Sequence, residues 1–190
     1  MKLDDYADAV VNQVRKIAAP AILVGHSMGG QVISAAAEKV PEQIERLVYV
    51  AAFLPRSGDS MVSLGREDTD SSLPNSTITS VLRGTFTIKP TALAQVFYND
   101  CTPEDIAQAQ GELVPESIRP SFGKVSLSAQ RFGSVPRSYI RCTDDRAISL
   151  TMQDLMISRQ GCEHVATLKS SHSPFISMPE QLVEAILQVS

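Results

Sequence analysis

A serine between two glycines follows a short apolar run near the start of the chain. Gly25-His26-Ser27-Met28-Gly29 fits the pattern G-x-S-x-G, with a strand-like run at 21–24 and a helical pattern at 28–39. A strand, a sharp turn and a helix around this pattern predict a nucleophile elbow, which holds a strained serine above the end of a sheet. We expect glycine at both flanking positions because a Cβ would collide with the neighbouring strand or helix.

A serine hydroxyl is a weak nucleophile until a base takes its proton, and the chain offers three histidines. His164 begins a predicted strand, whereas active groups in parallel sheets lie beyond the carboxyl ends of the strands. His26 adjoins Ser27, so its side chain diverges from the serine and suits a packing or pocket role. His172 follows a predicted strand by three residues at the correct end, and it is the candidate base.

The base needs a carboxylate that orients it, and this group should also follow a strand. Asp144 and Asp145 come directly after the predicted strand at 137–143, and Asp59 follows the one at 46–53. Asp59 is the outside candidate, and spacing alone does not separate Asp144 from Asp145.

Four predicted strands with helices between them would position these residues. Nearly continuous apolar strands are typical of a parallel sheet that helices cover on both faces, so we predict an α/β fold. Ser177 and Glu180 fit a capping box for a last helix. The domain is expected to span residues 1–190, with a small helical cap inserted at about 56–135 over the edge that carries Ser27. The strands are expected at 21–25, 46–53, 137–143 and 164–168, and the last helix is expected to bury Leu182, Val183, Ile186 and Leu187.

Composition and charge argue against a nucleic-acid-binding or membrane-spanning protein. The 190 residues are 43% hydrophobic and carry a net charge of −4 without a Lys/Arg cluster, so nucleic acid is not an expected partner. No apolar run approaches the ~18 residues of a membrane span. Three scattered cysteines without a C-x-x-C motif predict reduced thiols and a cytoplasmic setting. No metal or organic cofactor is expected.

Five stretches of the chain resemble one family, the α/β-hydrolase fold proteins of the plant methylesterase and hydroxynitrile lyase type with their bacterial esterase relatives. They lie at 23–30, 49–55, 97–101, 139–145 and 171–175. The resemblance implies Ser27 as nucleophile and His172 as base. The family also places its serine, acid and histidine in this order along the chain. The family's acid stands eight positions before a glutamine, and Gln153 is eight after Asp145, so the resemblance assigns the acid to Asp145.

The chain departs from the family at two places. Lyases of the family carry a lysine directly after the catalytic histidine, where this chain has Ser173, so ester hydrolysis is expected rather than cyanohydrin cleavage. Family members also carry further strands and a His-Gly loop ahead of the segment corresponding to Met1, and that loop supplies one of two oxyanion donors. We therefore expect an N-terminally truncated form of the fold in which the Met28 N–H is the remaining donor.

The resulting prediction is a carboxylesterase that acts on small esters, with a non-catalytic binding protein as the alternative. The elbow strand would form an apolar sheet edge, which we expect a second copy of the chain to cover. The expected pocket consists of His26, Phe53, Leu54, Phe97, Tyr98 and Phe175.

Overall fold

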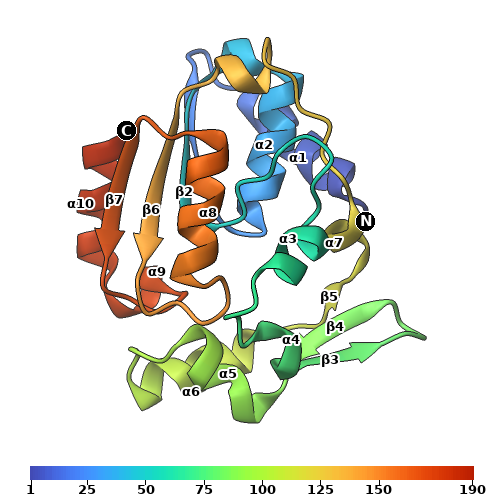
Figure 1. Ribbon diagram of the computed structural model, residues 1–190, viewed down its shortest axis with the longest axis vertical. Helices are drawn as coiled ribbons and strands as arrows, with labels where there is room; N and C mark the ends of the chain where they lie inside the picture. Colours follow the sequence, from blue (N-terminus) through green and yellow to red (C-terminus); the bar gives the residue numbers. More distant parts are fainter.

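A four-stranded parallel sheet forms the centre of the protein in the computed structural model, which describes residues 1–190 (Figure 1). The sheet has the order β1-β2-β6-β7, and the four predicted strands are confirmed. Their apolar runs place side chains alternately on the two faces, so both faces need cover. The strands are β1 (Ala21–Ser27), β2 (Ile44–Ala52), β6 (Arg137–Cys142) and β7 (His164–Leu168).

Helices cover both faces of the sheet. On one face, Leu47 and Tyr49 of β2 pack with residues of α1 (Leu3–Val14), α2 (Gly29–Lys39) and α8 (Leu150–Gln160). On the other face, Val48 and Val50 pack against α10 (Pro179–Val189). This alternation along β2 explains the three layers, and it confirms the predicted α/β architecture.

The last helix differs from its prediction. It begins at Pro179 without a side-chain cap, because the short helix α9 (Pro174–Ser177) takes up Ser177. The expected capping box was therefore wrong. Val183 and Leu187 are 55% and 72% exposed, whereas the buried residues are Leu182, Ala185 and Val189.

The cap lies below the carboxyl ends of the strands in Figure 1. It contains the helices α4 (Leu73–Ser76), α5 (Pro90–Phe97) and α6 (Pro103–Glu112). It also contains a small antiparallel sheet that the predicted helical cap did not include, because its strands are too short for a clear alternating pattern. These strands are β3 (Thr77–Ser80), β4 (Thr85–Ile88) and β5 (Glu116–Ser117).

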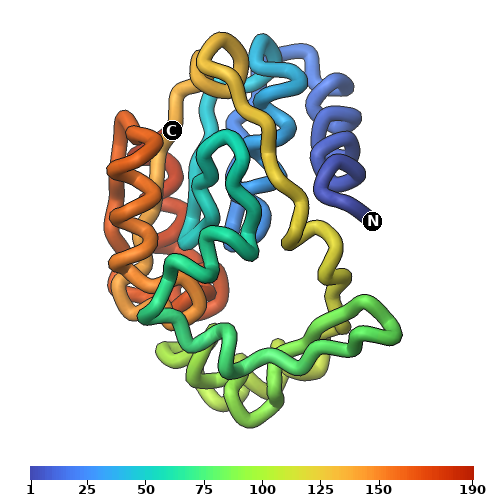
Figure 2. Tube along the Cα trace, turned by 45° about the vertical axis from the view of Figure 1, so that its right-hand side comes forward, coloured from blue at the N-terminus to red at the C-terminus, as the bar shows by residue number.

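Both ends of the expected insertion pack against the body of the molecule. Leu64, in α3 (Met61–Glu67), and Phe132, in the 3-10 helix η2 (Phe132–Ser134), belong to the main core. Figure 2 shows the return segment after α7 (Arg119–Phe122) running back from the cap along the body. The cap itself therefore occupies the middle of the 56–135 segment. One further 3-10 helix, η1 (Pro41–Gln43), connects α2 to β2.

The β1 strand forms one edge of the sheet, with β2 as its single neighbour. Ile22 and Val24 are 39% and 46% exposed. The edge that the sequence predicted is therefore present and apolar. None of the helices has the length and apolar character needed to cross a lipid bilayer.

Candidate active site

The elbow places Ser27 at the end of β1 in the left-handed region, with φ of 54°. A Cβ on Gly25 would lie 2.8 Å from the backbone of Gly29, so the first glycine of the motif is required. A Cβ on Gly29 itself would have no atom within 4 Å, so the expected collision there was wrong. The tight position is Gly30, where a Cβ would overlap the carbonyl oxygen of Phe53.

Asp145 and His172 form a buried pair, with 2.8 Å between Oδ2 and Nδ1. The other carboxylate oxygen of Asp145 accepts hydrogen bonds from the N–H groups of Ala147 and Ile148 at 2.7 and 3.0 Å. These donors stabilise the carboxylate, which in turn accepts the Nδ1–H of the imidazole. His172 is thereby oriented with Nε2 free to accept a proton.

Gln153 fixes the loop that carries Asp145. Its side-chain oxygen accepts from the Cys142 N–H at 3.0 Å, and its amide nitrogen donates to the carbonyls of Cys142 and Ile148 at 3.1 and 2.8 Å. The glutamine thus holds both ends of the 143–147 turn. This gives a physical reason for the spacing of eight residues between Asp145 and Gln153.

The other candidates from the sequence are not part of the pair formed by Asp145 and His172. They are Asp144, Asp59 and His164. The Asp144 carboxylate accepts from the Thr143 hydroxyl at 3.3 Å. Asp59 accepts from the backbone N–H and the guanidinium of Arg56 at 2.9 and 3.2 Å. His164 is exposed at the start of β7. Of the candidate carboxylates, the structure brings only Asp145 to His172.

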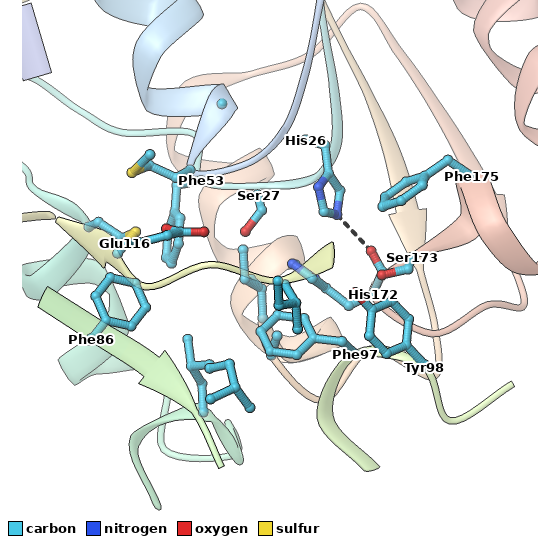
Figure 3. A pocket seen from close by; sticks show the side chains of 18 residues that line it. His26, Ser27, Phe53, Phe86, Phe97, Tyr98, Glu116, His172, Ser173 and Phe175 are labelled. Carbon is cyan, nitrogen blue, oxygen red and sulfur yellow. Dashed lines mark hydrogen bonds between the residues drawn. The ribbon is translucent and has the colours of Figure 1, made fainter. Parts of the chain in front are cut away.

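Ser27 and His172 line the same cavity (Figure 3). The His172 Nε2 is buried and has no hydrogen-bond partner, and no hydrogen bond joins it to Ser27. The Met28 N–H, at the start of α2, also donates no hydrogen bond within the protein. Ser27, Met28 and His172 therefore line one cavity, and the His172 Nε2 and the Met28 N–H make no hydrogen bond within the protein.

His26 supports the candidate base. Its Nε2 lies 2.7 Å from the carbonyl oxygen of His172, and the two ring centroids are 4.5 Å apart. Burial, together with the neighbouring imidazole of His172, lowers the pKa of His26 to about 3, although the bond to the carbonyl opposes this shift. His26 is therefore neutral, and its Nε2–H donates to the loop that carries His172.

The cavity has a volume of about 400 Å³. Five of the six predicted pocket residues line it, namely His26, Phe53, Phe97, Tyr98 and Phe175. Leu54 does not, because its side chain packs into the main core and is 1% exposed. Sequence reasoning missed the lining residues that the cap and the body loops add, because no local pattern shows which cap residues face the serine. They include Met61, Leu73, Phe86, Ile88, Leu113, Glu116 and Ile148.

Hydrogen bonds connect the cap to the loop of the candidate base. The Asp100 carboxylate accepts from the Ser171 N–H at 2.9 Å, and the Ser171 hydroxyl donates to the Phe97 carbonyl at 3.0 Å. Asn99 donates to the carbonyl of Asp144 at 3.1 Å. The segment 97–100 therefore holds together the loops that carry both His172 and Asp145.

Comparisons with known proteins agree with the fold. The family model described as "Alpha/beta hydrolase family" matches residues 2–185. Salicylic acid-binding protein 2 from Nicotiana tabacum is 31% identical over 89% of this chain and 70% of its own length. A crystal structure of tomato methylketone synthase I with 2-tridecanone is 26% identical, with a TM-score of 0.86 over 99% of this chain and 78% of that one.

The chain is shorter than many of these relatives. It spans between 40% and 58% of the length of five Arabidopsis thaliana proteins named as candidate chloroplastic methylesterases. The match nevertheless extends over nearly the whole of this chain, through the elbow, the cap and the last helix. The chain therefore belongs to the alpha/beta hydrolase family.

Proposed function

We propose that the protein is a serine hydrolase that cleaves small carboxylic esters through an acyl intermediate on Ser27. The observation that carries the proposal is the buried Asp145–His172 pair, whose free Nε2 faces the same apolar cavity as the elbow serine. Relatives named as methylesterases and a structural neighbour described as a pyrethroid hydrolase support ester hydrolysis as the reaction class.

In the proposed reaction, the Ser27 hydroxyl attacks the ester carbonyl carbon while Nε2 of His172 takes its proton. The tetrahedral intermediate collapses, and the imidazolium returns the proton to the departing alkoxide. Water then attacks the acyl-enzyme with His172 again as base, which releases the carboxylic acid and restores the serine. Asp145 keeps the proton on Nδ1 and stabilises the imidazolium in both steps.

The Met28 N–H would donate to the oxyanion of each tetrahedral intermediate. It starts α2, so the positive end of the helix dipole adds to the stabilisation. Removing one oxyanion donor from an acyl-transfer enzyme typically costs about 10²–10³ in turnover. Turnover by this chain alone is therefore expected to be slow if the Met28 N–H acts without a second donor.

A second candidate function is binding without turnover. The absence of a hydrogen bond between Ser27 and His172 favours it, because an unactivated serine would leave the cavity as a ligand site only. The two functions differ in whether the serine reacts with an electrophile that resembles an ester.

Intact-mass measurement after exposure to a fluorophosphonate tests the proposal directly. We expect one adduct on the folded protein, lost in Ser27→Ala and strongly reduced in His172→Ala. Ser173→Ala is the matched control, because this hydroxyl also lines the cavity but should keep the adduct. An absence of adduct on folded protein would reject the hydrolase and leave the binding function.

A further inference from the structure

The cavity next to Ser27 contains one carboxylate that the proposed chemistry does not use. Glu116 comes from β5 of the cap, and its backbone is paired with Phe86 of β4. Figure 3 shows its carboxylate directed into the same space as Ser27, beside Phe53. Strand pairing therefore fixes the backbone of Glu116 within the cap sheet.

Glu116 has no partner within the protein. Its carboxylate makes no ion pair or hydrogen bond, and partial burial alone raises its pKa. Neither lysine nor arginine nor a second acidic residue is among the 18 residues that line the cavity. Glu116 is an exposed residue that also lines the cavity, so a ligand bound there can reach its carboxylate.

The remaining walls also suit a cation. Five aromatic side chains line the cavity, and aromatic faces attract ammonium groups within about 6 Å. These residues are Phe53, Phe86, Phe97, Tyr98 and Phe175. Aromatic walls with a single carboxylate, and without a basic side chain, favour a ligand that is apolar and positively charged.

We propose that Glu116 selects esters that carry a positively charged ammonium group. This inference rests on the proposed function for its substrate class, but the recognition of the cation can be measured without turnover. The ammonium would lie between the carboxylate and the aromatic walls, with the ester carbonyl directed toward Ser27.

The test compares acetylcholine with 3,3-dimethylbutyl acetate, which has the same shape with carbon in place of the quaternary nitrogen. Binding of each ester is measured by competition with a fluorescent ligand of the cavity, in a Ser27→Ala background that prevents hydrolysis. We expect acetylcholine to bind at least about threefold more tightly than the neutral ester. Glu116→Gln should remove the difference, since it keeps the shape of the side chain and loses the charge.

Glu104→Gln is the matched control, because Glu104 is an exposed cap glutamate outside the cavity. It should leave the preference for acetylcholine intact. Equal affinity for the two esters, or a preference that survives Glu116→Gln, would overturn the inference. If binding shows the preference but the protein with Ser27 hydrolyses neither ester, the ester-hydrolase proposal fails while ammonium recognition stands.

Discussion

At the scale of single residues, the imidazole of His172 is held from several directions. Asp145 accepts its Nδ1–H, and His26 bonds to its backbone carbonyl. The ring of Phe97 lies 5.1 Å from its centroid. These contacts leave Nε2 as the one ring atom free to exchange a proton with a substrate.

The neutral state of His26 predicts a specific pH dependence of stability. The unfolded chain binds a proton at His26 below about pH 6.5, whereas the folded protein resists protonation down to about pH 3. The contribution of the neutral His26 side chain to the free energy of unfolding is therefore complete above pH 6.5, and it is lost as the pH falls toward 3. The free energy of unfolding should fall by up to about 1.4 kcal/mol per pH unit from this group.

Urea unfolding of His26→Gln between pH 7 and pH 4 isolates this contribution. Glutamine can still donate to the His172 carbonyl, but it does not titrate, so the variant should lose less stability on acidification. His164→Gln is the control, because His164 is exposed at the start of β7. Equal pH slopes for the wild type and His26→Gln would show that His26 is protonated in the folded state.

At the scale of elements, the elbow depends on how closely α2 approaches the sheet. Gly30, on the first turn of α2, faces the end of β2, where a Cβ would lie 2.9 Å from both Ala52 and Tyr49. Tyr49 in turn shares a hydrogen bond of 2.7 Å with Ser34, one turn further along the helix. A small residue at position 30 therefore sets the distance between the helix and the sheet, and with it the position of Ser27.

Gly30→Ala should destabilise the protein by about 2–3 kcal/mol, because backbone and core atoms must move to admit the methyl group. Gly29→Ala should change stability by less than about 0.5 kcal/mol, since the space around position 29 is open. Denaturant unfolding of both variants measures the difference. A Gly29→Ala variant as unstable as Gly30→Ala would contradict the assigned packing.

At the scale of the whole molecule, the edge of the sheet at β1 stays open. The outer backbone groups of β1 have no neighbouring strand, and Ile22 and Val24 lie exposed beside them. The helix that covers this face of the sheet, α10, packs mainly against β7 and β6 and against Val48 and Val50 of β2. Such an edge is a site for pairing with another chain.

We predict that the protein self-associates through β1. Sedimentation equilibrium should show dimers that dissociate on dilution, and Val24→Lys should weaken the association about tenfold or more, because it places a charge on the pairing edge. Val183→Lys, on the exposed face of α10, is the control and should leave association unchanged. A wild-type protein that stays monomeric at high concentration would reject this prediction.

Much of the body was predictable from local patterns. The apolar strand runs and the G-x-S-x-G turn located the sheet and Ser27. The cap was less predictable, because its strands of two to four residues are too short to show a period. The buried face of α10 was also misjudged, since its apolar residues surround much of the helix.

The sequence by itself identified the candidate nucleophile and base, because few of its side chains could serve in these roles and strand order limits where they lie. Tertiary structure decided the contacts between distant segments. It directed Leu54 into the core, brought Glu116 into the cavity and made His26 a support for His172. These outcomes depend on the direction in which each side chain points once the cap has folded over the sheet, and residue types along a chain do not encode that direction locally.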